Sequence, residues 1–321
     1  MIKMILVYSD HKNLCIELLS KATVLAKELN TKTAAVLIGK ADEKTAKEYI
    51  AYGADSVLSV ETDLKQYKSE EYASILQQLI KETNAELLLI GSDKNGKELA
   101  SRLAGMINAG CIIDATDVSI ADGNITAQRV VYSGNAVSIE QFQSTPAIIT
   151  VPSKVFDPLP KDEKRKGDIK KISITPQHAA SKVVKIAEKQ AGGVNIEEAE
   201  IIVSCGRGIK NKEDIQLANN LAEVLKGRTV GCSRPIAADL KWLPEEHWIG
   251  LSGHKVKPKL YIAAGISGQI QHIAGMRDSG VVVAINKDAD ALIFKSADYG
   301  IVGDLYKVLP KLTEAIKTKM E

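Results

Sequence analysis

One segment decides the fold of the last third of the chain, Lys259-Leu-Tyr-Ile-Ala-Ala-Gly-Ile-Ser-Gly-Gln-Ile-Gln-His272. Its apolar run, Leu260 to Ala264, has the length and composition of a buried strand, and Gln269 to Met276 has helical spacing. The turn Gly265-Ile266-Ser267-Gly268 separates the two. Strand, glycine turn and helix form an arrangement in which backbone N–H groups converge on an anion, most often a nucleotide phosphate.

Further motifs follow strands in the same part of the chain. Val281 to Ile285 predicts a second buried strand, which ends at Asn286, and a third apolar segment carries Ala297-Asp298-Tyr299-Gly300. Upstream, Ser233-Arg234-Pro235 follows a short strand. An Arg held at the carboxyl end of a strand points into the crevice where α/β sheets bind ligands.

Together these motifs closely resemble the C-terminal FAD domain of the electron transfer flavoprotein alpha subunit. The resemblance extends back through Gly250-Leu251-Ser252-Gly253 to Cys205-Gly206-Arg207-Gly208. It is dense over residues 200–310 and looser in the N-terminal part. It implies FAD as cofactor and a heterodimer with an electron transfer flavoprotein beta subunit, which binds AMP or a second FAD.

The resemblance also implies a role for individual residues. Arg234 would lie beside the isoalloxazine ring and favour its reduced, anionic forms, while Ser252 could hydrogen-bond flavin N5. His272 would donate to the flavin pyrimidine carbonyl. Asn286 and Asp298 match positions that contact the adenosine half and the pyrophosphate, and we expect Asp298 on the ribose. The expected FAD-binding residues are Ser233, Arg234, Ser252, Gly253, Gly265, Ser267, Gly268, Gln271, His272, Asn286 and Asp298.

The sequence departs from the family pattern in the segment Gly250 to His254. The commonest pattern of the resembled family is Gln-Thr-Gly-Lys, where this chain has Leu251-Ser-Gly-His254. The Ser hydroxyl is retained, but Leu251 loses an amide and His254 replaces a long cation with a shorter, titratable one. These changes could tune the flavin potential in either direction. The nearby Gly206-Arg-Gly208 lacks a complete dinucleotide fingerprint, because residue 211 is Asn.

Composition excludes several functional classes. The 321 residues suit two domains. The 42 Lys and Arg nearly balance the 40 Asp and Glu, and aromatics are 4%, so no nucleic-acid-binding surface is indicated. Four dispersed cysteines predict free thiols and no metal site. Apolar runs are far shorter than the ~20 residues of a membrane span, and no signal peptide is evident, which predicts a cytoplasmic protein.

The predicted fold class is α/β with two domains. Residues 1–192 alternate strands and helices, which indicates a parallel sheet. Three period-two segments, 114–120, 125–132 and 147–151, predict an antiparallel extension, with a hairpin at Asp122-Gly123-Asn124. Residues 156–171 read as an exposed connector, and 172–188 as an edge strand that then turns. Residues 193–321 form the predicted doubly wound FAD-binding domain.

In the N-terminal domain, Gly91 to Lys97 follows a strand and opens a helix, but it lacks P-loop spacing. We interpret it as structural, and the resemblance implies that this domain packs on the beta subunit without binding a nucleotide.

Nucleophile–base pairs and paired catalytic carboxylates are not evident, so we expect no catalytic residues. The expected function is an electron carrier, redox-active through FAD, rather than a stand-alone enzyme. By resemblance, it accepts electrons from acyl-CoA-type dehydrogenases of fatty acid beta-oxidation and passes them to a membrane quinone oxidoreductase. A shuttle-flavin subunit of an electron-bifurcating, NADH-dependent complex and a universal-stress-type nucleotide-binding module are the alternatives.

Overall fold

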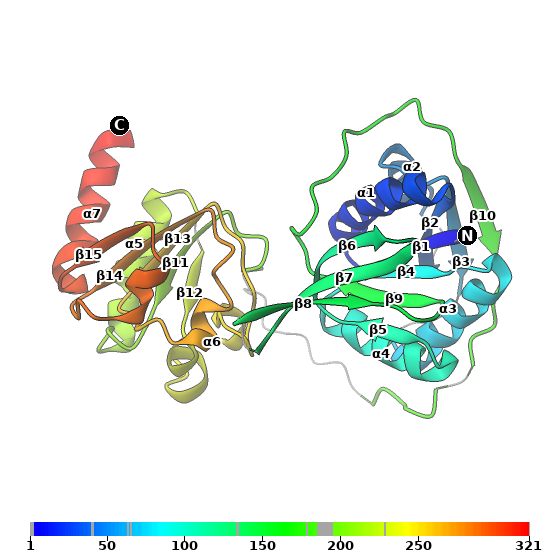
Figure 1. Cartoon of the computed structure of the whole chain (residues 1–321). Coiled ribbons are helices and arrows are strands. Elements are labelled where there is room, and N and C mark those ends of the chain that lie inside the picture. Colours follow the sequence, from blue (N-terminus) through cyan, green and yellow to red (C-terminus); the bar gives the residue numbers. More distant parts are fainter. Residues whose placement is uncertain are drawn as a thin grey trace. The chain divides into compact units, whose positions relative to one another are not determined.

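Two parallel β-sheets, one in each half of the chain, organise the structure (Figure 1). The structure is a computed structural model that describes residues 3–39, 42–62, 64, 66–132, 135–177, 179–184, 195–227 and 229–320. The chain divides into two compact units, residues 1–185 and 186–321. The predicted α/β fold with two domains is confirmed. The predicted boundary between residues 192 and 193 lies outside the described residues.

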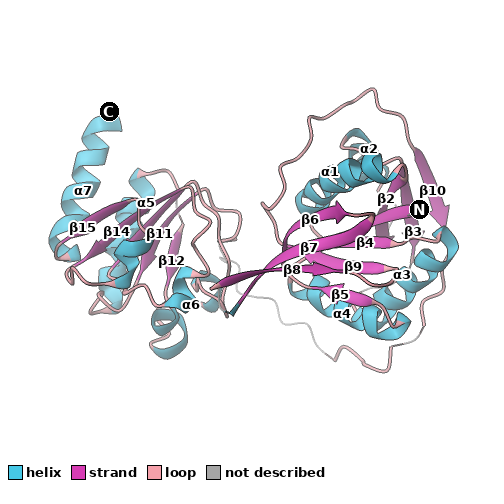
Figure 2. Cartoon of the chain, in the orientation of Figure 1, coloured by secondary structure: helices cyan, strands magenta, loops and turns pink. Residues whose placement is uncertain are grey.

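The first unit is built on a seven-stranded sheet of order β10-β3-β2-β1-β4-β9-β5, in which all paired strands are parallel. Helices cover both faces (Figure 2), so its central strands read as continuous apolar runs. The strands are β1 (Met4–Tyr8), β2 (Lys32–Gly39), β3 (Ser56–Glu61), β4 (Leu87–Gly91), β5 (Gly110–Ile112), β9 (Ala147–Val151) and β10 (Asp168–Ile172), and the helices are α1 (Lys12–Leu29), α2 (Glu43–Ala51), α3 (Ser69–Thr83) and α4 (Lys94–Ile107).

A separate three-stranded antiparallel sheet packs on the α1 side of this core. It contains β6 (Ala115–Ala121), β7 (Asn124–Val131) and β8 (Ala136–Gln141). The hairpin expected at Asp122-Gly123 joins the first two strands, and both residues have positive φ, 50° and 77°. The placement of 147–151 in this sheet is wrong. That segment is β9, buried along its whole length between β4 and β5, because its apolar run suits a core strand.

The segment predicted as an exposed connector is largely exposed, and it also forms a strap across the first unit. Residues 168–172 form β10, which pairs in parallel with β3 at the edge of the sheet. The predicted edge strand 172–188 is therefore wrong over its described part, since the strand ends at Ile172. Upstream, the backbone N–H of Leu159 donates to Ser20 Oγ at 2.8 Å, and that of Asp162 donates to the Ala51 carbonyl at 2.9 Å. These hydrogen bonds hold a segment that buries little apolar surface.

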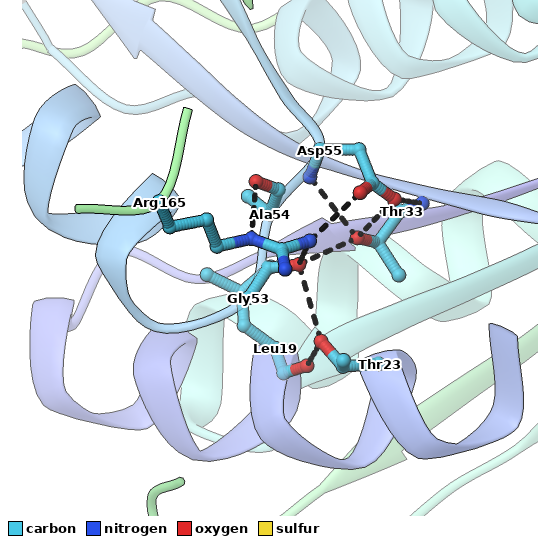
Figure 3. Close-up of polar contacts among 7 residues, drawn as sticks. All are labelled: Leu19, Thr23, Thr33, Gly53, Ala54, Asp55 and Arg165. Carbon is cyan, nitrogen blue, oxygen red and sulfur yellow. Dashed lines mark hydrogen bonds and ion pairs between the residues drawn. The ribbon is translucent and has the colours of Figure 1, made fainter. Parts of the chain in front are cut away.

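Arg165 fixes the strap to the loop between α2 and β3 (Figure 3). Its Nη2 donates to Asp55 Oδ1 at 2.7 Å and to the Gly53 carbonyl at 3.1 Å. The other oxygen of Asp55 accepts the backbone N–H of Thr33 at 2.9 Å. Thr33 is 1% exposed, so Asp55 satisfies a buried donor at the start of β2 while it holds the strap.

We expect Asp55→Ala to destabilise the first unit by about 2–3 kcal/mol, because it leaves the Thr33 N–H buried and unpaired. Arg165→Gln should cost less, about 1 kcal/mol, since the ion pair is partly exposed. Denaturant unfolding followed by far-UV circular dichroism measures both. Lys161→Gln, which removes an exposed ion pair to Glu163 in the same strap, is the matched control. Equal effects of Asp55→Ala and Lys161→Gln would contradict this account.

The second unit contains a five-stranded parallel sheet of order β12-β11-β13-β14-β15. In chain order this is 2-1-3-4-5, a doubly wound sheet whose switch point lies between β11 and β13. Helices α5 and α7 cover one face, and the turns around α6 and η5 cover the other. The elements are β11 (Ile201–Cys205), η2 (Lys212–Ile215), α5 (Gln216–Val224), β12 (Val230–Cys232), η3 (Pro235–Asp239), η4 (Glu245–His247), β13 (Leu260–Ala264), α6 (Ile270–Ile273), β14 (Val281–Asn286), η5 (Leu292–Ser296), β15 (Tyr299–Val302) and α7 (Leu305–Met320).

None of the described helices has both the length and the apolar character that a membrane span requires.

Candidate functional site

The carboxyl ends of the strands in the second unit meet at one edge of the sheet. Cys205 at the end of β11 is level with Cys232 of β12 and with Ala264 of β13. The residues that follow these strands are therefore neighbours in space, although they come from separate parts of the chain. This edge brings together the segments after β11, β12 and β13, together with Asn286 at the end of β14.

The glycine turn after β13 is tightly packed against two other loops. Gly265 and Gly268 have φ of 65° and 81°. A Cβ on Gly268 would lie 2.1 Å from the backbone nitrogen of Ile293, the residue whose N–H donates to the Ser267 carbonyl at 3.2 Å. On its other side the Gly265 carbonyl accepts the Gly208 N–H at 3.0 Å. Only glycine fits at these positions.

The helix that follows this turn is shorter than predicted. The pattern indicated a helix from Gln269 to Met276, but α6 contains four residues, Ile270–Ile273, and turns follow it. Asn286 contacts the Gly265–Gly268 turn. Its Nδ2 donates to the Ile266 carbonyl at 2.9 Å, and its Oδ1 accepts the Asp288 N–H at 3.0 Å. The described contacts of Asn286 therefore position the turn.

Trp248 connects the other predicted segments. The guanidinium carbon of exposed Arg234 lies 5.9 Å from the centre of a Trp248 ring, within cation–π range. A Cβ on Gly253 would lie 2.5 Å from the Trp248 carbonyl. The same loop reaches α6, since the Leu251 N–H donates to the Gln271 carbonyl at 2.7 Å. The structure thus brings Arg234, the loop that contains Ser252 and Gly253, and Gln271 together around one indole.

His272 is buried beneath this group, 7% exposed. Its Nε2 lies 2.9 Å from the hydroxyl of Tyr261, while its Nδ1 is buried and makes no hydrogen bond. Burial lowers the pKa of His272 to about 4, although the nearby Ile249 carbonyl acts in the opposite direction. The ring is therefore neutral near pH 7.

Two comparisons place this arrangement in a family. The sequence profile of the "Electron transfer flavoprotein domain" matches residues 5–177, and that of the "Electron transfer flavoprotein FAD-binding domain" matches residues 195–277. The electron transfer flavoprotein subunit alpha of Bacillus subtilis (strain 168) is 44% identical over 285 residues, which are 88% of this chain and 86% of that protein. The chain belongs to the electron transfer flavoprotein alpha-subunit family.

Other relatives cover nearly the whole chain. The electron transfer flavoprotein subunit alpha of Thermoanaerobacterium thermosaccharolyticum is 42% identical over 310 residues, 95% of this chain and 93% of that protein. Protein FixB of an Escherichia coli O1:K1 strain is 37% identical over 311 residues, 97% of each. As an electron transfer flavoprotein alpha subunit, the chain is an electron carrier with FAD as its cofactor, and membership implies a heterodimer with a beta subunit. Neither alternative function is favoured by these similarities.

The sheet edge of this alpha subunit suits FAD in three physical respects. The Gly265–Gly268 turn stands at the carboxyl end of β13, beside the switch point where doubly wound sheets bind ligands, and both glycines pack it against neighbouring backbone. Arg234 presents an exposed positive charge. The buried Nδ1 of His272 lacks a hydrogen-bond partner, which a ligand atom can supply.

Asp298 is not part of this group, contrary to the expectation from the sequence. It precedes β15, and its Oδ2 accepts the N–H of Val282 at 2.8 Å. Val282 is the second residue of β14, so Asp298 lies at the amino edge of the sheet, whereas Asn286 ends the same strand at the carboxyl edge. Asp304, which follows β15 and whose Oδ1 accepts the Tyr306 N–H at 3.0 Å, is a carboxylate that does lie at the carboxyl edge. The sequence could have identified Asp304 in place of Asp298, because Asp304 follows the apolar strand and Val302-Gly303, whereas Asp298 precedes that strand.

Sequence reasoning also missed Trp248 and Tyr261. Trp248 lies between two short helical turns and the Gly250–Gly253 loop, and no spacing in the sequence relates it to Arg234. Tyr261 was assigned to a buried strand only. His254, where the chain departs from the common pattern, has its Nδ1 2.8 Å from Glu197 Oε1.

The turn from Gly91 to Lys97 in the first unit has a structural role. A Cβ on Gly96 would lie 1.8 Å from the Gly91 carbonyl, and the Gly96 N–H donates to the Asp93 side chain at 2.6 Å. Lys97 Nζ lies 2.9 Å from Asp114. The donors at the start of α4 are therefore capped by the chain's own carboxylate.

Proposed function

We propose that this alpha subunit accepts electrons from dehydrogenases of the acyl-CoA type and passes them to a membrane-associated quinone oxidoreductase. In this proposal the carrier is cytoplasmic and serves fatty acid beta-oxidation, and its beta subunit holds AMP or a second FAD. The first unit packs on the beta subunit and binds no nucleotide. FAD, when bound, supplies the electron-transfer chemistry, and the protein supplies its orientation and electrostatic environment.

The observation that supports this proposal is the grouping of Arg234, the Gly250–Gly253 loop and His272 around the carboxyl edge of the second sheet. A cation, a hydroxyl and a buried imidazole thereby surround one place, at which they can orient an uncharged ring and favour negative charge on it. We propose that FAD is held by Ser233, Arg234, Ser252, Gly253, Gly265, Ser267, Gly268, Gln271, His272 and Asn286.

Each group has a separate task in this proposal. The Gly265–Gly268 turn, which Asn286 holds through the Ile266 carbonyl, provides the close backbone approach for the pyrophosphate. Arg234, within cation–π range of Trp248, provides a positive charge near the flavin. Ser252 is exposed and can offer its hydroxyl, and His272 offers a ring N–H.

We expect Arg234→Ala to lower the first reduction potential of the bound flavin by about 60–130 mV. The range assumes that a charge-assisted hydrogen bond of roughly 1.5–3 kcal/mol is gained mainly on reduction, at about 59 mV per ~1.4 kcal/mol for one electron. Spectroelectrochemical titration measures the potential. Arg234→Lys keeps the charge and should shift the potential less. Lys311→Ala, which removes an exposed charge from α7, is the matched control. An unchanged potential in Arg234→Ala would remove this residue from the mechanism.

The function is tested by co-expressing the chain with the beta-type subunit encoded beside it and counting the cofactors released. One FAD per heterodimer, reduced by an acyl-CoA dehydrogenase with its substrate and reoxidised by a quinone oxidoreductase, supports the proposal. Two FAD with NADH-driven ferredoxin reduction would replace it with electron bifurcation. A colourless heterodimer that takes up no added FAD would refute it.

A further inference from the structure

The strand β13 carries a buried tyrosine that contacts His272 of the proposed flavin site. Tyr261 is 0% exposed, and its ring packs at a 53° tilt against His272, with centroids 6.2 Å apart. Its hydroxyl lies 2.9 Å from His272 Nε2. This is the one described hydrogen bond of the imidazole, so it governs how the ring is oriented and where its proton lies.

We propose that Tyr261 is a positioning residue: its hydroxyl donates to Nε2 of His272 and thereby holds the single proton of the neutral ring on Nδ1, where it can be donated to a flavin carbonyl. The flavin contact of His272 rests on the function proposed above. The contact between Tyr261 and His272 does not, since it belongs to the chain itself.

The protonation of both groups is consistent with this direction of donation. Burial raises the pKa of Tyr261 well above its usual range, so the hydroxyl keeps its proton. Burial lowers that of His272, so the imidazole carries one proton and not two. A neutral imidazole has one N–H and one acceptor nitrogen, and the hydroxyl can supply the proton for the acceptor.

The opposite tautomer, with the proton on Nε2, fits the surroundings less well. Nε2–H would donate to the Tyr261 hydroxyl, whose own proton would then need another acceptor. Ser204 Oγ, the buried hydroxyl on the neighbouring strand β11, lies close to the Tyr261 hydroxyl and can accept this proton, but the structure forms no such hydrogen bond. The Ile249 carbonyl lies near the ring but accepts no hydrogen bond from Nδ1. The missing acceptor for the tyrosine proton favours the proton on Nδ1.

This assignment explains the unpaired atom in the core. A buried N–H without an acceptor is costly, about 1–3 kcal/mol, and native structures keep few of them. Nδ1 has no hydrogen-bond partner, so with the proton assigned to it this nitrogen is such an N–H. A ligand carbonyl that accepts from it gains a hydrogen bond to a donor already oriented by Tyr261, and that bond strengthens as negative charge accumulates on the carbonyl oxygen.

The test combines ring ¹⁵N NMR with a redox titration on the co-expressed heterodimer, its histidines labelled with ¹⁵N. In the FAD-free wild type we expect the His272 proton on Nδ1. In Tyr261→Phe, which removes only the hydroxyl, we expect it to move to Nε2, and the equilibrium constant for the first one-electron reduction of bound FAD to fall about tenfold, equivalent to about 59 mV. Tyr299→Phe removes an exposed hydroxyl from β15 and should change neither.

A wild-type proton on Nε2 would overturn the proposal, and so would a Tyr261→Phe variant in which the tautomer or the potential stays unchanged. If Tyr261→Phe does not fold, the position of the His272 proton in the wild type by itself decides whether the proposal holds. The double variant Tyr261→Phe with His272→Gln should shift the potential no further than His272→Gln alone, since Tyr261 acts through the imidazole. Additive shifts would assign Tyr261 a separate effect. A wild type that binds no FAD would refute the proposed function, while the NMR result would still test the contact.

Discussion

Replacing Gly268 with alanine is expected to abolish FAD binding and to destabilise the second unit by about 3 kcal/mol or more. Two costs combine. A non-glycine residue at φ 81° is strained by about 1–2 kcal/mol, and displacement of packed neighbours adds about 1–3 kcal/mol. The displacement is unavoidable, because the new methyl would lie 2.1 Å from the Ile293 backbone nitrogen and 2.5 Å from its Cα. Backbone atoms on η5 cannot rotate away as a side chain would.

The matched control is Gly123→Ala in the β6–β7 hairpin. Gly123 has nearly the same φ, 77°, but a Cβ there would meet no atom within 4 Å. We expect only the strain cost, about 1–2 kcal/mol, and unchanged FAD binding. FAD titration and denaturant unfolding of both variants separate strain from collision. A Gly268→Ala protein that binds FAD like the wild type would show that FAD binding does not require the Gly265–Gly268 turn.

The second large effect concerns pH. We expect the FAD-free second unit to lose roughly 3 kcal/mol of stability through His272 as the pH falls from about 6.5 to about 4. The folded ring has its pKa lowered to about 4 by burial, whereas the unfolded ring titrates near 6.5. Below 6.5 the unfolded chain takes up a proton that the folded chain excludes, so acid favours unfolding. Above 6.5 both states are neutral and the contribution is constant.

His272→Gln isolates this contribution, because it removes the titrating group and keeps a hydrogen-bonding side chain. The difference in free energy of unfolding between wild type and variant should change between about pH 7 and about pH 4.5. The fluorescence of Trp242 and Trp248, the two tryptophans of the chain, reports on the second unit alone. Parallel stability curves for the two proteins would mean that His272 titrates normally and is not held neutral by burial.

Much of the second unit could be predicted from local sequence. The apolar run before Gly265 and the glycines after it dictate a buried strand and a sharp turn, since few other sequences satisfy both requirements. The resemblance to the electron transfer flavoprotein alpha subunit rested on such local motifs, and the comparisons confirm it. In the first unit, Asp122-Gly123 similarly determined a hairpin, because both positions need positive φ.

The local sequence pattern predicted strand pairing least well for short segments, because a short strand can pair with more than one neighbouring strand. Residues 147–151 were interpreted as an antiparallel strand, yet they lie between β4 and β5 in the parallel sheet. Residues 168–172, three of which are charged, form β10 at the sheet edge because an edge strand needs only one pairing partner. Strand pairing depends on the whole sheet, so a segment of five residues does not specify it.

The sequence by itself determined the fold class, the family, the cofactor and the glycine turn, because each of these depends on residues adjacent in the chain. Only the tertiary structure decided which side chains share the sheet edge. It separated Asp298 from Asn286 by the length of β14, placed Trp248 against Arg234, and set the Tyr261 hydroxyl on His272. These contacts join residues 11 to 14 positions apart through strand register and loop packing, and such distances follow from the whole sheet rather than from any local pattern.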